Sequence, residues 1–305
     1  MSSQGNTPRI QGSIVAIVTP MHDDGKVDFD ALTRLVEWHI AEGTDAIVAV
    51  GTTGESATLD VVEHASAIEH VIKVAARRIP IIAGTGANST REAIELTQTA
   101  KKLGADAALL VTPYYNKPTQ EGLYRHHRAI AEAVDLPQML YNVPGRTGVD
   151  MHNDTVVRLA QVDGIVSIKD ATGDLARGHE LITRLNALPN GGIDVLSGDD
   201  ATAWQLIGLG AKGNISVTAN VAPRAMHEIC RAALEGNAAL AEQLNQKIAI
   251  LHQILFCESN PIPVKWALHD MGKIGLGLRL PLTVLANEYQ AQVHAALVES
   301  GALPR

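Results

Sequence analysis

Eight short runs of apolar and β-branched residues recur along this chain of 305 residues, and segments of helical periodicity separate them. The runs occupy residues 13–18, 46–50, 79–84, 106–111, 137–142, 164–169, 193–198 and 213–217. Strands that alternate with helices form parallel sheets, because each helix returns the chain to the end at which the next strand begins. Eight such repeats predict a (β/α)8 TIM barrel of the α/β class.

The segments between the runs carry the residues that cap helices. Segments 30–42 and 60–78 begin with Asp, and segment 90–104 begins with Thr and ends with Gly. After the eighth run the chain keeps helical periodicity and has no further strand pattern. We therefore expect a barrel over residues 1–222 and a C-terminal helical region over residues 223–305.

The composition narrows the classes of ligand. The chain is 46% hydrophobic, and its formal net charge of -8 comes without any basic run, which argues against nucleic acid and anionic membrane as partners. It has no secretory signal pattern and no apolar run near the roughly 18 residues of a membrane span. Cys230 and Cys257 have neither metal nor redox spacing and are expected to be reduced. We expect a cytoplasmic protein with small-molecule ligands.

Polar residues gather where the predicted strands end. The second run leads into "GTTGES", the fourth into "TPYYNKP" and the fifth into "YNVPGRTG". Three of the five tyrosines, Tyr114, Tyr115 and Tyr141, fall at these ends. Active sites of (β/α)8 barrels lie at the carboxyl ends of the strands. These loops are therefore the candidate active site.

Lys169 ends the sixth run, "GIVSIK". Side chains alternate along a strand, so Ile165 shares a face with Lys169. Val166 and Ile168 share the other face, which suits the layer beneath the helices. Lys169 is then predicted to point into the barrel, where desolvation favours a neutral amine that can attack carbonyl carbon. The alternative is an ion pair between Lys169 and Asp170 or another acid at the rim.

Other strand-end residues also have two interpretations. "GTTGES" is either a tight turn before a helix or a cradle for a carboxylate, built from backbone N–H groups and the hydroxyls of Thr52 and Thr53. Arg146 either pairs with a surface acid or binds a substrate carboxylate in a bidentate manner. The tyrosines either pack at the rim or transfer protons.

Several cofactor classes are disfavoured. "GLGAKG" has the letters of a dinucleotide-binding loop but precedes a strand instead of following one. Neither a phosphate-binding G-x-x-x-x-G-K-[ST] motif nor H-E-x-x-H occurs, and most of the histidines fall within helical segments. The sequence thus predicts no catalytic metal.

Six motifs taken together resemble the dihydrodipicolinate synthase (4-hydroxy-tetrahydrodipicolinate synthase) family. They are "GTTGES", "TPYYNKPTQEGLY", "YNVPGRTG", "SIKDATGD", "SGDD" and "ISVTAN", in this order, and the resemblance covers essentially the whole chain. It implies a lyase of lysine (diaminopimelate) biosynthesis. This lyase condenses pyruvate with L-aspartate 4-semialdehyde through a Schiff base and needs no metal or organic cofactor.

The resemblance also assigns roles to residues. Lys169 matches the Schiff-base lysine and Tyr141 the proton-relay tyrosine beside it. Thr53 matches the hydroxyl between Tyr141 and Tyr115, and Tyr115 matches a tyrosine that enters the site of a neighbouring subunit. Thr52 and Thr53 match the residues that hold the pyruvate carboxylate. The remaining substrate-binding residues are Arg146, Gly198 and Ile215.

Assembly and regulation are implied in the same way. The resemblance implies a homotetramer built from two tight dimers. In lysine-inhibited relatives the effector lies at the tight-dimer interface, near residues that match Ser56, Ala57, His64, Asn88, Glu92 and Tyr114 in this chain. Sensitive relatives often have histidine where this chain has Val61, so we expect only weak inhibition.

Two other functions compete with this one. N-acetylneuraminate lyase and keto-deoxy-sugar aldolases use the same lysine and tyrosine, but Arg146 favours an acceptor that carries a carboxylate over a polyhydroxylated sugar. A non-catalytic barrel that senses a small molecule would not need an amine, phenols and a hydroxyl to converge.

Overall fold

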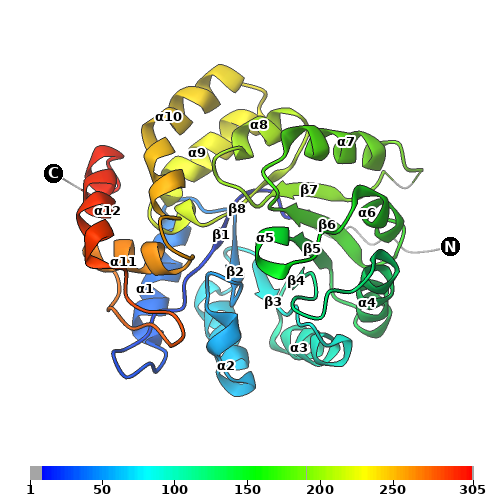
Figure 1. The fold of residues 1–305 in the computed structure, drawn as a ribbon, viewed down its shortest axis with the longest axis horizontal. Helices are drawn as coiled ribbons and strands as arrows, with labels where there is room; N and C mark the ends of the chain where they lie inside the picture. The colour runs from blue at the N-terminus through cyan, green and yellow to red at the C-terminus, as the bar shows by residue number, and fades with distance from the viewer. Residues whose placement is uncertain (1–8, 190, 304–305) are drawn as a thin grey trace.

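The strands form one closed barrel. The structure, a computed structural model, describes residues 9–189 and 191–303. All eight strands in these ranges are parallel, each pairs with its neighbour in sequence, and β8 closes onto β1 (Figure 1). The strands are β1 Gly12–Ala16, β2 Ala46–Ala49, β3 Ile81–Gly84, β4 Ala107–Val111, β5 Gln138–Asn142, β6 Ile165–Asp170, β7 Asp194–Ser197 and β8 Gly213–Ser216. The predicted (β/α)8 barrel is confirmed.

Helices surround the barrel and extend beyond it (Figure 1). They are α1 Phe29–Ala41, η1 Ser56–Thr58, α2 Val61–Ala75, α3 Thr90–Leu103, α4 Gln120–Ala133, α5 Pro144–Thr147, α6 Asn153–Leu159, α7 Leu175–Asn186, α8 Ala203–Gly208, η2 Thr218–Asn220, α9 Pro223–Leu234, α10 Ala238–Ile254, α11 Ile262–Asp270 and α12 Asn287–Glu299. The predicted caps hold some of the helix ends, but α1 and α3 are capped by Asp28 and Ser89, which precede the predicted Asp30 and Thr90. Asp60 and Glu63 form a capping box at the start of α2, and Gly104 ends α3 with a φ of +93°. No helix among the described residues has the length and apolarity that crossing a membrane requires.

Two apolar layers define the inside and the outside of the barrel. Side chains from alternate strand positions, such as Ile14, Val48, Leu109, Tyr141 and Ile215, form one buried cluster in the interior. The other strand face packs under the helices in separate clusters. Tyr141 and Ile215 therefore belong to the interior.

The alternation along β6 is interrupted by an irregularity. Pairing with β5 shifts register after Gln138, so that Met139 pairs with Ser167 and Val166 is left out of the ladder. As a result Ile165 packs with the helices and Val166 packs against the interior cluster, which reverses the faces expected for these two residues. The expectation is correct for Ile168, which lies beyond the shift and packs under the helices.

The C-terminal helices extend the barrel on one side. α9 packs on β1 and β8 and occupies the position of the eighth barrel helix, and α10 packs on α8 and α9. α11 and α12 pack against each other beside α10, at the orange-to-red end of the chain in Figure 1. The described part of the C-terminal region contains these four helices and a non-helical segment over residues 271–286, and the division at residue 222 remains a prediction.

Candidate active site

Lys169 lies buried in β6, next to Tyr141 on β5. The two residues are register partners on adjacent strands, and the Lys169 Nζ lies 4.3 Å from the centroid of the Tyr141 ring. Only 6% of Lys169 is exposed. Burial beside an aromatic ring limits the hydration of the amine and brings a phenol close to it. This pair combines a nucleophile with a group that can transfer protons.

The ion-pair interpretation of Lys169 is wrong. In the described ranges no carboxylate lies within ion-pair distance of its amine. The adjacent Asp170 accepts a hydrogen bond of 2.8 Å from the Thr172 N–H, and its other oxygen lies 3.6 Å from Nε of Arg177. The Lys169 amine is therefore available for chemistry.

Gly198 provides the space that the Lys169 side chain occupies. A Cβ atom at Gly198 would lie 2.8 Å from Cε of Lys169 and 2.7 Å from Cβ of Ala171. Real Cβ atoms do not approach carbon this closely, because the repulsion is too strong. Any larger residue after β7 would displace the lysine.

Thr52 and Thr53 lie in the loop after β2. The loop turns tightly, with Gly54 N–H donating to the Gly51 carbonyl at 3.0 Å and Glu55 N–H to the Thr52 carbonyl at 3.1 Å. Thr53 is buried, and its Oγ1 accepts a hydrogen bond of 2.9 Å from Asn260. Across residues 9–189 and 191–303, neither Tyr141 nor Tyr115 is hydrogen-bonded to Thr53. The expected link runs through the Tyr115 of a neighbouring subunit and stays a prediction.

Asn260 is a site residue that sequence reasoning missed. Its Nδ2 donates to Thr53, and its backbone carbonyl accepts a hydrogen bond of 3.1 Å from Nη2 of Arg146. It is buried, and its side-chain oxygen has no partner among the described residues. Asn260 joins two strand-end loops from a position just before α11, where no strand-end pattern could reveal it.

Arg146 lies exposed in α5, after β5. A guanidinium has five N–H donors, and among the described residues only Asn260 accepts from one nitrogen of Arg146. It has no ion pair with a described carboxylate. The surface-pair interpretation is thus wrong, and the remaining donors can bind an anion.

Tyr115 lies exposed on the surface of the chain. It is 89% exposed, and its φ of +72° is unusual for a residue with a side chain. Its backbone N–H donates to the Thr147 carbonyl at 3.4 Å. With this exposure, the Tyr115 side chain does not lie inside its own barrel.

The residues expected to bind lysine lie on three segments, which follow β2, β3 and β4. Asn88 donates from its side chain to the Tyr114 carbonyl at 3.3 Å, and burial and the Glu92 carboxylate raise the pKa of Tyr114. Ser56, Ala57 and the buried His64 lie on η1 and α2, and α2 packs on α3. Val61, at the start of α2, is 64% exposed.

The described side chains offer no ready-made metal site. No group of three or more His, Cys, Asp or Glu residues in this part of the chain is arranged to hold an ion.

Known proteins give an independent comparison. A model of the Dihydrodipicolinate synthetase family matches residues 9–300. The 4-hydroxy-tetrahydrodipicolinate synthase of Thioalkalivibrio sulfidiphilus is 63% identical over 95% of this chain and 97% of its own length. That of Methylococcus capsulatus is also 63% identical, over 96% of this chain and all of its own length.

Two solved structures share the fold closely. One is the chloride-inhibited dihydrodipicolinate synthase of Acinetobacter baumannii in complex with pyruvate, which is 66% identical with a TM-score of 0.95 and matches 97% of this chain and all of its own. The other is the Cyanidioschyzon merolae enzyme with lysine bound, which is 38% identical with a TM-score of 0.91 over 96% of this chain and 99% of its own.

Proposed function

Because this chain belongs to the dihydrodipicolinate synthetase family, we propose that Lys169 forms an imine with pyruvate and that the imine condenses with L-aspartate 4-semialdehyde. The chain is a lyase with the activity of 4-hydroxy-tetrahydrodipicolinate synthase, in lysine biosynthesis. The observation that carries the mechanism is the buried Lys169 amine beside Tyr141, without a carboxylate partner.

The chemistry follows from the amine. Lys169 Nζ adds to the pyruvate ketone carbon, and loss of water gives an iminium ion. The iminium withdraws electrons, which acidifies the methyl group and allows an enamine to form. The enamine carbon bonds to the aldehyde carbon, whose oxygen becomes a hydroxyl. The amino group of the semialdehyde then displaces Lys169 and closes the ring. Because the iminium is the electron sink, we propose that no metal or organic cofactor takes part.

The surrounding residues move protons and hold the substrates. We propose that Tyr141 transfers protons to and from the Lys169 intermediates. A hydroxyl has one proton and two acceptor positions, so Thr53 can accept from Asn260 and from a phenol while donating to the pyruvate carboxylate. Thr52 offers a second hydroxyl in the same loop. Gly198 lies against the Lys169 side chain, and Ile215 belongs to the interior cluster that includes Tyr141, which supports a place for both near the bound substrate.

A substrate comparison tests the function. Purified enzyme is given pyruvate with L-aspartate 4-semialdehyde in one assay, and N-acetylneuraminate or 2-keto-3-deoxygluconate in two others. We expect turnover with the semialdehyde alone, because the free donors of Arg146 suit a carboxylate. Cleavage of either sugar acid at a comparable kcat/KM would favour the sister aldolases.

We propose that Tyr115 completes the site of a partner subunit within a homotetramer of two tight dimers. Its exposure supports this proposal. The Lys169→Ala and Tyr115→Phe proteins, each with little activity alone, are mixed so that their subunits exchange and form heterodimers. Since each heterodimer would regain one site free of both lesions, about a quarter of the sites should recover. Verified exchange without recovery would mean that Tyr115 acts within its own chain.

We propose that free lysine is a weak effector, bound near Glu92, Asn88 and Tyr114. The lysine-bound relative supports a lysine site in this fold. Val61 offers no polar contact, and one hydrogen bond contributes about 0.5–1.5 kcal/mol, or roughly two- to tenfold in affinity. Lysine should therefore inhibit the native enzyme partially, and Val61→His should bind lysine several-fold more tightly.

A lysine titration of three proteins measures this effect. Val62→His is the matched control, because Val62 is exposed on the next position of α2. Complete inhibition of the native enzyme at low lysine concentration, or equal gains from both histidines, would contradict the role given to Val61.

The proposed compartment is the cytoplasm. Pyruvate and L-aspartate 4-semialdehyde are intermediates of central and amino-acid metabolism, and an enzyme that joins them works where both are made.

A further inference from the structure

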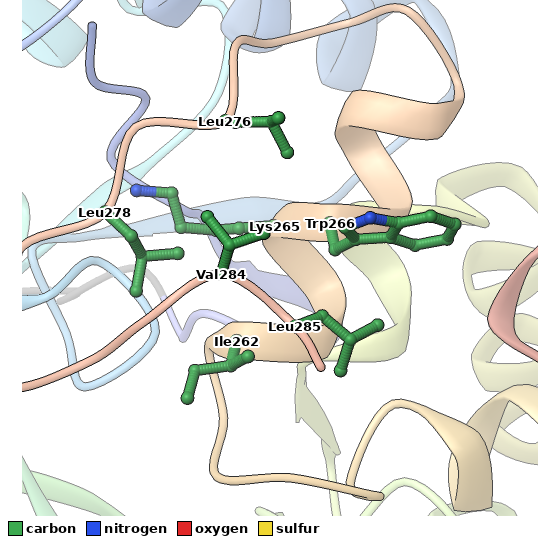
Figure 2. A pocket seen from close by; sticks show the side chains of 7 residues that line it. All are labelled: Ile262, Lys265, Trp266, Leu276, Leu278, Val284 and Leu285. Atoms are coloured by element: carbon green, nitrogen blue, oxygen red, sulfur yellow. The ribbon is translucent and has the colours of Figure 1, made fainter. Parts of the chain in front are cut away.

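A buried ion pair lies outside the groups that the mechanism uses. Lys265, on α11, is 2% exposed, and its Nζ donates to the Glu55 carboxylate and, at 3.0 Å, to the Thr19 carbonyl. Burial lowers the pKa of this ammonium, and the neighbouring Glu55 carboxylate opposes that shift. Figure 2 shows the lysine among apolar neighbours: Ile262, Trp266, Leu276, Leu278, Val284 and Leu285. The pair is thus largely shielded from water.

Glu55 belongs to the loop that contains Thr52 and Thr53. Its φ of +58° lies in the left-handed region, which residues with side chains occupy at a cost. Both carboxylate oxygens are held: one by Lys265 and the other by the Arg279 N–H at 3.3 Å. Because the Glu55 N–H donates to the Thr52 carbonyl, the side-chain anchor acts directly on the loop.

The same C-terminal segment contacts the loop a second time. Asn260 holds the Thr53 hydroxyl, five positions before Lys265 in the sequence. On the other side of the loop, Thr19 donates from Oγ1 to the Gly54 carbonyl at 2.7 Å, while its own carbonyl accepts from Lys265. Lys265 therefore connects the ends of β1 and β2 at the point where the loop turns.

We infer that Lys265 is a positioning residue: its ion pair holds Glu55 in the left-handed conformation and so fixes the Thr52 and Thr53 hydroxyls for the pyruvate carboxylate. The inference rests on the proposed function of these threonines. Stability alone does not account for the pair, because desolvation offsets most of the attraction between buried charges, and apolar replacements are often equally stable. What the pair adds is a fixed geometry for the loop.

The test separates positioning from stability with a neutral pair. Lys265→Met alone leaves a buried, unpaired carboxylate and should lower the melting temperature. The double variant Lys265→Met/Glu55→Gln removes both charges at nearly constant volume and should melt near the native temperature. Because Lys265 no longer holds the loop, the kcat/KM of the double variant for pyruvate should be about 10²-fold lower than that of the native enzyme. The KM for the semialdehyde should stay within about twofold, because Arg146 belongs to another loop.

Leu185→Ala is the matched control for lost stability. Leu185 is buried near the end of α7, remote from the carboxyl ends of the strands, and its truncation leaves a cavity. This variant should melt at a lower temperature and keep native kcat/KM values at temperatures where it is folded.

Three outcomes decide the question, and a fourth tests the proposed function. A folded double variant that traps pyruvate with borohydride about 10²-fold more slowly than the native enzyme, at low pyruvate concentration, supports positioning. A folded double variant with native kinetics overturns it, as does an equal rise in the KM of both substrates. Failure of the native enzyme to trap pyruvate at all would instead overturn the proposed function.

Discussion

Lys169→Ala is expected to lower kcat at least about 10³-fold, because the covalent intermediate cannot form without its amine. The protein should remain folded. The side chain lies beside Gly198 and the Tyr141 ring rather than within the apolar layer under the helices, so its removal costs little packing. Circular dichroism and a melting curve check the fold, and a coupled assay measures the turnover.

Trapping identifies the reacting lysine directly. Pyruvate followed by borohydride should add one reduced adduct to the native enzyme, and peptide mapping should locate it at Lys169. Lys265 is the other buried lysine among the described residues, and its amine is occupied by Glu55 and Thr19. Lys247→Ala, at an exposed position of α10, is the control. This variant should keep native activity and still form the reduced adduct at Lys169. An adduct on any other lysine would exclude the mechanism.

The barrel and the place of Lys169 could be predicted from the sequence because both depend on local patterns. Eight β-branched runs alternate with capped helices, and this alternation leaves few other architectures. The register shift in β6 could not be predicted, since it depends on pairing with β5. It exchanges the faces of Ile165 and Val166 but leaves Lys169 directed inward, beside Tyr141.

Residues that act from distant segments could not be predicted. Asn260 and Thr53 are 207 positions apart, and Glu55 and Lys265 are 210 apart. Strand-end patterns show where a barrel exposes polar groups, but not which C-terminal helix packs on them. Adjacency in the sequence can also mislead. Lys169 and Asp170 are neighbours in the sequence, which suggests an ion pair, but consecutive side chains of a strand point to opposite faces. Asp170 therefore lies near Arg177 instead.

Arg146→Ala is expected to weaken the use of L-aspartate 4-semialdehyde and to spare the first half-reaction. Hydrogen bonds to charged groups contribute about 1.5–3 kcal/mol, which corresponds to a roughly 10- to 150-fold lower kcat/KM for the semialdehyde. Trapping of pyruvate on Lys169 should continue at a nearly native rate, because the proposed mechanism assigns the pyruvate carboxylate to the threonine loop and not to Arg146. Steady-state kinetics with each substrate varied in turn, together with trapping rates, measure the two effects separately.

Two variants distinguish substrate binding from support of the fold. Arg146 also donates to the Asn260 carbonyl, so its loss could disturb Thr53 through Asn260. Arg146→Lys keeps the charge but not the planar fork of donors, and should recover only part of the lost kcat/KM. Arg34→Ala, at an exposed position of α1, should leave kcat/KM unchanged for both substrates. If Arg146→Ala slows pyruvate trapping as much as it slows the condensation, Arg146 acts by holding Asn260 and the carboxylate of the semialdehyde is bound elsewhere.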